Sequence, residues 1–238
     1  MSRVLVAHYI ADLATQYSSY WAELIASEFR AAGHDTRELT GAADTQAGLL
    51  SSMEQFQPSL VVFAGHGSER IMTGAGIQPI LVACNNDQIM AGSSALFVAC
   101  LTGIELCPSI VSKGGLAAQG YVKEFMFMTD GSGVPSSDQY AYSFMRTLVL
   151  AARAVAQGGS WRDWYQTFKT VSQEEIAWWN QSEDPLAGSV VFCLQSNLSA
   201  AVVSGGGTVD TSPIPGEEGA AGGGLAPLVI IGVILAFA

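Results

Sequence analysis

Two reactive side chains each follow a short apolar segment of the sequence. His66 comes after Leu60–Ala64 and a single glycine, and Cys100 comes directly after Ala95–Ala99. Apolar runs of five residues bounded by turn residues are typical of buried β-strands. If the two strands are parallel members of one sheet, both side chains emerge at the same edge. The sequence therefore predicts a His66–Cys100 catalytic dyad.

The chemistry expected of this pair is nucleophilic catalysis by a thiol. A cysteine with an unperturbed pKa of about 8.5 is mostly protonated at neutral pH. A neighbouring imidazole activates it, either by accepting the proton or by stabilising the thiolate as an ion pair. The backbone amides of Gly67 and Cys100 are the candidate donors to an oxyanion, an interaction worth roughly 2.7–4 kcal/mol in a transition state.

Strand and helix patterns alternate through most of the chain, which predicts an α/β fold with a mostly parallel sheet and helices on both faces. In such sheets, ligands bind beyond the carboxyl ends of the strands. His8 also follows a strand but has no partner in the sequence, so it is interpreted as structural. The expected strands are 3–9, 34–39, 60–64, 95–99, 114–121 and 189–194, and the expected helices are 14–32, 45–56, 104–112, 136–157 and 161–181.

The two motifs resemble those of the caspase-like (clan CD) cysteine peptidases. The first reads SLVVFAGHGS over 59–68 and the second reads ALFVACLTG over 95–103, wording closest to CHAT-domain and gingipain-like members. The resemblance implies a caspase-like α/β/α sandwich, with Cys100 as nucleophile and His66 as base or proton donor. It also implies a thioester intermediate, a protein or peptide substrate, and no metal or organic cofactor.

The resemblance does not extend to a substrate pocket. Val98 stands before the Ala-Cys pair, where caspases and legumain-like members tend to have Gln or Glu. No substrate-binding residue can therefore be assigned. We expect a charged P1 residue, because an acidic pocket residue would select Arg or Lys and a basic one would select Asp. The gingipain-like wording and the acidic surplus of the chain favour Arg or Lys. The candidate loop charges have both signs: Glu69, Arg70, Glu105, Lys123, Glu124 and Asp130.

Composition excludes several other classes of protein. Apolar residues make up 49% of the chain, charged residues 13%, and the net charge is −11, which is typical of a packed globule that does not bind nucleic acid. The four cysteines form no CxxC pair, so a zinc site is not expected. Cys84, Cys107 and Cys193 are interpreted as buried packing thiols. The N-terminus resembles a strand more than a signal peptide, which predicts a cytoplasmic domain.

The pattern divides the chain into a peptidase domain over 1–204, a Gly/Pro-rich linker over 205–224 and an apolar tail over 225–238. The uncharged stretch 219–238 just reaches the length of a membrane span, but it carries glycines, a proline and no flanking basic residue. Membrane association and packing against protein, including self-association, both stay open. A catalytically silent caspase-like scaffold whose tail mediates assembly is the alternative function. Acyl transfer to an amine, as in a transpeptidase, is a third possibility.

Overall fold

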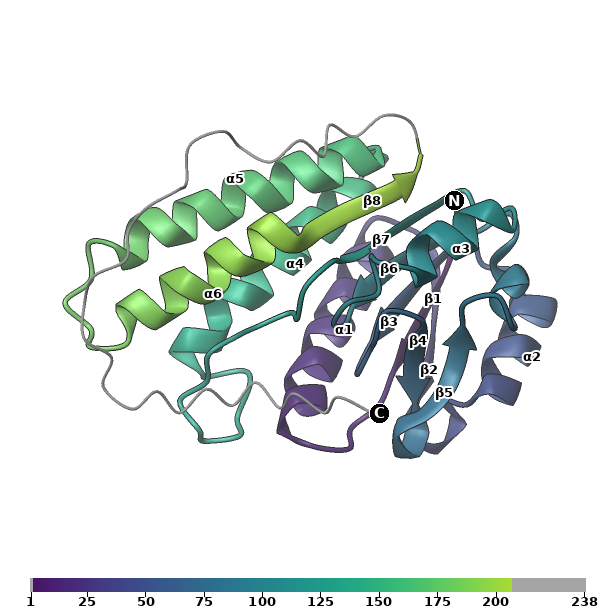
Figure 1. Ribbon diagram of the computed structural model, residues 1–238, viewed down its shortest axis with the longest axis horizontal. Coiled ribbons are helices and arrows are strands. Elements are labelled where there is room, and N and C mark those ends of the chain that lie inside the picture. The colour runs from purple at the N-terminus through teal and green to yellow at the C-terminus, as the bar shows by residue number, and fades with distance from the viewer. Residues whose placement is uncertain (1, 207–238) are drawn as a thin grey trace.

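A computed structural model describes residues 2–206 of the chain, so nearly all of the predicted linker and the whole apolar tail lie outside the described residues. Six strands form the central sheet in the order β2-β1-β3-β6-β7-β8, and β4 and β5 form a separate antiparallel hairpin (Figure 1). The strands are β1 (Arg3–His8), β2 (Asp35–Thr40), β3 (Leu60–Ala64), β4 (Ile71–Gly74), β5 (Gln78–Val82), β6 (Ser94–Val98), β7 (Ala117–Tyr121) and β8 (Ala201–Gly205).

Helices cover both faces of this sheet, as Figure 1 shows. The helices are α1 (Leu13–Ala31), α2 (Gln46–Phe56), α3 (Leu106–Ser112), α4 (Gln139–Ala156), α5 (Trp161–Trp179) and α6 (Ala187–Ala200), with short 3₁₀ turns at Gly41–Ala43, Ala75–Ile77 and Asp87–Met90. All pairings within the six-stranded sheet are parallel except that of β7 with β8. The predicted α/β fold class, a mostly parallel sheet between helical layers, is confirmed.

Two separate apolar clusters form the core, one on each face of the sheet. Side chains alternate along each strand, so Val4 and Val6 of β1 join the cluster under α1, α4, α5 and α6, whereas Leu5 and Ala7 join the cluster under α2, α3 and the β4–β5 hairpin. Strands that are buried on both faces need no polar alternation. This is why β3 and β6 appear in the sequence as continuous apolar runs.

One element was predicted wrongly. The segment 189–194 was expected to be the last strand, but it lies inside α6, and the last strand is β8, antiparallel to β7. The buried residues Val190, Val191, Leu194 and Asn197 recur at helical spacing, and the helical pattern continues beyond the short apolar run. A short run of apolar residues does not distinguish a strand from a buried helix.

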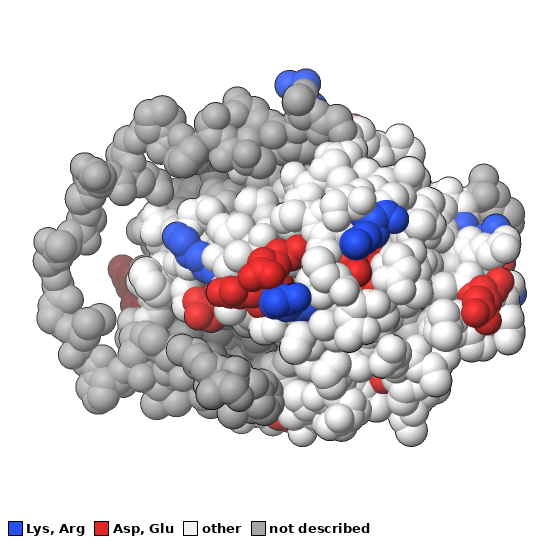
Figure 2. Space-filling model, turned by 45° about the vertical axis from the view of Figure 1, so that its right-hand side comes forward, with Lys and Arg blue, Asp and Glu red and all other residues white. Residues whose placement is uncertain are grey.

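The surface carries few charges. On the face shown in Figure 2, basic and acidic side chains lie singly or in small mixed groups between large uncharged areas. Within residues 2–206, no helix combines the length and the apolar character that crossing a bilayer requires.

Candidate active site

The strands that precede His66 and Cys100 are neighbours in the sheet. β3 pairs with β6 in parallel, and Ala64 lies opposite Val98 in the register. His66 and Cys100 each follow these paired residues by two positions, so both leave the sheet at its carboxyl edge and at the same height. The backbones of the two motifs touch there: a Cβ placed on Gly67 would lie 2.7 Å from the carbonyl oxygen of Cys100. Only glycine fits at this position.

A carboxylate that the sequence reasoning did not single out holds the imidazole of His66. Nε2 of His66 lies 2.6 Å from Oδ2 of Asp12, which follows β1 at the same edge. Asp12 is also the N-cap of α1, where its Oδ1 accepts the amide of Thr15 at 2.9 Å, and the hydroxyl of Thr15 caps the Asp12 amide in return. One carboxylate oxygen thus anchors the helix and the other faces the histidine.

The state of Asp12 determines the tautomer of His66. Burial alone would raise the pKa of this carboxyl, but hydrogen bonds from the Thr15 amide, His66 and the Thr15 hydroxyl lower it below its ordinary value of 3.8. An ionised carboxylate only accepts hydrogen bonds, so Nε2 of neutral His66 carries the proton. Within residues 2–206, no hydrogen bond is made by Nδ1, whose lone pair is therefore free to act as a base.

Cys100 is a thiol in this structure. Its side chain is half-buried, and its Sγ faces the backbone oxygen of Phe125 at 3.9 Å. Burial has the largest effect and raises the pKa of Cys100, the Phe125 contact lowers it by a smaller amount, and the charge of Glu124, the smallest of the three effects, raises it. In the described part of the chain no hydrogen bond joins Cys100 to His66. The raised pKa of the thiol favours proton transfer during attack over a preformed thiolate.

The backbone around Cys100 is bent sharply. Leu101, the next residue, has a φ of +59°, in the left-handed region that non-glycine residues rarely adopt. Its amide donates to the carbonyl of Lys123 at 3.2 Å, which ties the turn to the segment after β7. The amides of Gly67 and Cys100 themselves donate no hydrogen bond to any group in residues 2–206, so both are available to a ligand.

The charged loop residues that could influence substrate choice differ in the partners they contact. Arg70 pairs with Glu105 at 3.4 Å, and Nζ of Lys123 donates to the hydroxyl of Ser199 at 3.2 Å. The carboxylate of Asp130 accepts the amide of Ser132 at 2.8 Å. Glu124 is exposed, next to the thiol, and no ion pair within the described residues engages it. Of these charges, that of Glu124 acts on the thiol of Cys100.

The remaining histidines and cysteines lie outside this arrangement. His8 is buried, with Nδ1 2.7 Å from the hydroxyl of Ser19 and Nε2 3.1 Å from Glu38, as a structural histidine should be. Cys107 and Cys193 are buried as predicted, but the prediction for Cys84 was wrong, because this thiol is exposed. No group of three or more potential metal ligands occurs within residues 2–206.

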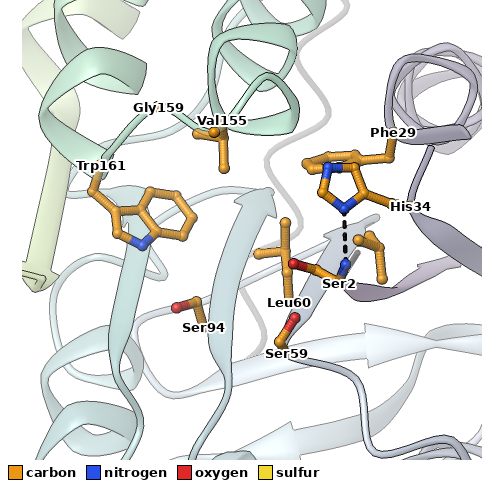
Figure 3. Close-up of a pocket in the computed structure, with 11 residues that line it drawn as sticks. Ser2, Phe29, His34, Ser59, Leu60, Ser94, Val155, Gly159 and Trp161 are labelled. Atoms are coloured by element: carbon orange, nitrogen blue, oxygen red, sulfur yellow. Dashed lines mark hydrogen bonds between the residues drawn. The ribbon is translucent and has the colours of Figure 1, made fainter. Parts of the chain in front are cut away.

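A concave feature lies at the opposite edge of the sheet. A pocket of about 260 Å³ is lined by the amino ends of β1, β3 and β6 and by side chains from three helical segments (Figure 3). His34 stands in its wall, with Nδ1 accepting the amide of Ser2 at 3.2 Å and Nε2 donating to the carbonyl of Ala156 at 2.7 Å. Both ring nitrogens of His34 are occupied.

Seven chains of solved structures are similar to this chain. A solved structure described as a secreted C11 cysteine protease from Bacteroides thetaiotaomicron, "iotapain", is similar with probability 1.00, a TM-score of 0.46 and 10% sequence identity. The similarity covers 79% of this chain and 73% of that chain. No family model and no curated protein matches the sequence. None of these findings assigns a residue of this site.

Proposed function

We propose that this protein is a cysteine peptidase in which Asp12, His66 and Cys100 act together. The observation that carries the proposal is the register of β3 and β6, which puts a half-buried thiol and a histidine with one free ring nitrogen at the same edge of the sheet. Nucleophile, base and an acidic group that orients the base are the parts that covalent acyl transfer requires. The sequence resemblance to caspase-like peptidases points the same way.

The reaction begins with attack of the Cys100 sulfur on the carbonyl carbon of the scissile bond, while the thiol proton passes to Nδ1 of His66. Asp12 stabilises the resulting imidazolium through Nε2–H. The amides of Gly67 and Cys100, which have no other acceptor in the described chain, donate to the oxyanion. Collapse of this intermediate breaks the C–N bond, the imidazolium protonates the leaving amine, and a thioester remains on Cys100.

The second half of the reaction releases the acyl group. Water attacks the thioester carbonyl, gives a proton to His66 and leaves a carboxylic acid, while the sulfur leaves as a thiolate and recovers its proton. An amine in place of water would form a new peptide bond by the same steps. Product analysis with and without an added amine nucleophile distinguishes hydrolysis from transpeptidation.

The charge beside the thiol supports a basic P1 residue. Glu124 acts on Cys100 without a neutralising partner in the described chain, whereas the nearby Arg70 is paired with Glu105. A basic P1 side chain would gain from that negative charge, and an acidic one would be repelled. The assignment of the chain to the CHAT-domain or gingipain-like branch stays a prediction.

A fluorogenic peptide library with Arg, Lys, Asp or Asn at P1 tests the function on the full chain. We expect turnover of the Arg and Lys peptides that disappears in Cys100→Ala and persists in Cys84→Ala, the matched control at an exposed thiol. Turnover that survives Cys100→Ala would refute the assignment of the nucleophile. The absence of turnover of every peptide, in the presence and absence of calcium, would favour the silent scaffold and direct attention to the tail.

A further inference from the structure

Two hydroxyl groups link the backbone amide of His66 to the carbonyl of the same residue. The amide of His66 donates to the hydroxyl of Tyr9 at 3.4 Å, and the hydroxyl of Tyr9 lies 2.6 Å from that of Thr73. The Thr73 hydroxyl donates to the carbonyl oxygen of His66 at 2.9 Å, and the amide of Thr73 donates to the same oxygen at 3.0 Å. The contacts form a closed ring around one residue.

The direction of every hydrogen bond in this ring is fixed. A carbonyl oxygen only accepts hydrogen bonds, so the hydroxyl of Thr73 donates its proton to the carbonyl of His66 and must accept from Tyr9. Tyr9 therefore donates to Thr73 and accepts from the amide of His66. Hydrogen bonds arranged in one direction polarise one another, and a fully satisfied buried network specifies one geometry. The link from the His66 amide is the longest and therefore the weakest of the ring.

The ring of Tyr9 is itself held in place by packing. Tyr9 is 2% exposed, and a Cβ placed on the neighbouring Gly65 would lie 2.6 Å from its Cε1 atom. Glycine at position 65 lets the phenol approach the backbone that leads into His66. Burial raises the pKa of Tyr9, so the phenol remains a neutral donor over the range in which a peptidase would work.

Tyr9 and Asp12 divide the positioning of His66 between them. Both lie on the segment that joins β1 to α1, three residues apart. Asp12 holds the imidazole through Nε2, and Tyr9 holds the main chain through the amide. Thr73 adds a second hold from the β4–β5 hairpin, which makes that hairpin part of the support of the site.

We propose that Tyr9 is a positioning residue of the peptidase, which together with Thr73 fixes the backbone of His66 so that the imidazole keeps its hydrogen bond to Asp12 at the edge of the sheet where Cys100 emerges. The proposal rests on the proposed function. Within residues 2–206 no hydrogen bond joins Tyr9 to Cys100, and the effect of Tyr9 passes through the placement of His66. It predicts that removing one hydroxyl oxygen lowers the rate of the chemical step without changing substrate affinity.

The test compares Tyr9→Phe and Thr73→Val with two controls in the full chain. Thr73→Ser keeps the hydroxyl, and Tyr142→Phe removes a phenol from an exposed position on α4. We expect kcat to fall by roughly 10- to 100-fold in Tyr9→Phe and Thr73→Val, with KM unchanged. Thr73→Ser and Tyr142→Phe should retain the wild-type kcat.

A second readout does not depend on turnover. In protein labelled with ¹⁵N-histidine, the Nε2–H resonance of His66 reports its hydrogen bond to Asp12, and His34 at the opposite edge serves as internal reference. We expect the His66 resonance to shift or broaden in Tyr9→Phe and Thr73→Val and to return in Thr73→Ser, with the His34 resonance unchanged. An unaltered His66 resonance in both variants would overturn the proposal. If no peptide is cleaved by the wild type, the proposed function fails, and this measurement still decides the positioning role.

Discussion

The same three strands, β1, β3 and β6, end in very different surroundings at their two edges. At the amino edge they line a pocket of about 260 Å³ (Figure 3), and the histidine in its wall has both ring nitrogens bonded to backbone groups. At the carboxyl edge, His66 has one nitrogen on a carboxylate and the other free, beside the strand that ends in Cys100. A cavity therefore does not by itself mark a reactive site. An incompletely satisfied set of reactive groups is the better guide.

Replacing His66 at the carboxyl edge and His34 at the amino edge should give the largest difference in kcat. His66→Ala removes the base, so we expect kcat to fall by roughly 10²–10⁴-fold, the usual contribution of general acid–base catalysis. His34→Ala should change the thermal midpoint and leave kcat near the wild-type value. Parallel measurement of kcat and thermal unfolding checks both. Equal losses of kcat in the two variants would contradict a catalytic role that belongs to His66 and not to His34.

Asp12→Asn removes the carboxylate that faces His66 but keeps the cap of α1, so it separates the two roles of this residue. Asparagine caps helices as well as aspartate does, so stability at neutral pH should change little. It can present an N–H to Nε2 and select the wrong tautomer of His66, so we expect kcat to fall by about 10²-fold. Steady-state kinetics at a saturating peptide concentration measures this loss. An unchanged kcat would remove Asp12 from the site.

Asp12→Asn should also change how the stability of the protein depends on pH in acid. The folded-state pKa of Asp12 lies below its ordinary value of 3.8, so this group stabilises the fold above pH 3.8 and loses that contribution as the pH falls through the lowered pKa. Wild type should therefore lose stability more steeply than Asp12→Asn as the pH falls below about 4. Urea midpoints that are similar at neutral pH should therefore separate as the pH falls, with the wild type dropping below Asp12→Asn. Parallel curves would contradict the assigned shift.

How much of this could be predicted from the sequence depends on the range of the interaction. The strand ends that carry His66 and Cys100 were predictable because an apolar run followed by a turn is a local pattern. Asp12 was not singled out, because its contact with His66 spans 54 positions, although an aspartate three residues before Thr15 at a strand-to-helix junction is a capping-box signal. Tyr9 gave no local signal, because its role depends on a ring closed by Thr73. The misassigned segment 189–194 shows the limit of short apolar runs.

Alanine substitutions at Gly67 and Gly188 compare the site with a position on α6, and we expect effects of intermediate size. Gly67→Ala would force a Cβ to within 2.7 Å of the Cys100 carbonyl, so the two motifs must move apart. We expect a loss of kcat of at least about tenfold, together with a lower thermal midpoint. Gly188→Ala in α6 has no atom within 4 Å of the added Cβ and should stabilise the helix by up to about 1 kcal/mol with activity intact. A harmless Gly67→Ala would contradict the close approach of the two motifs.

The pH dependence of alkylation by iodoacetamide tests the state of the Cys100 thiol without any substitution, and it is the smallest of the expected effects. Because burial raises the pKa of this thiol, its rate of alkylation should keep rising with pH beyond 9, by about tenfold per unit below the pKa. Peptide mapping at each pH gives the rate at Cys100 separately from that at the exposed Cys84. A plateau of the Cys100 rate near neutral pH would indicate a preformed thiolate–imidazolium pair instead of a thiol.

The most direct test of the dyad is labelling of the full chain by a peptidyl chloromethyl ketone with arginine at P1, followed by mass spectrometry. A single adduct should form on Cys100, should be absent in Cys100→Ala, and should form far more slowly in His66→Ala, while Cys84 stays unmodified. An adduct on Cys84, or labelling of Cys100 at the same rate with and without His66, would contradict a catalytic dyad at the carboxyl edge of the sheet.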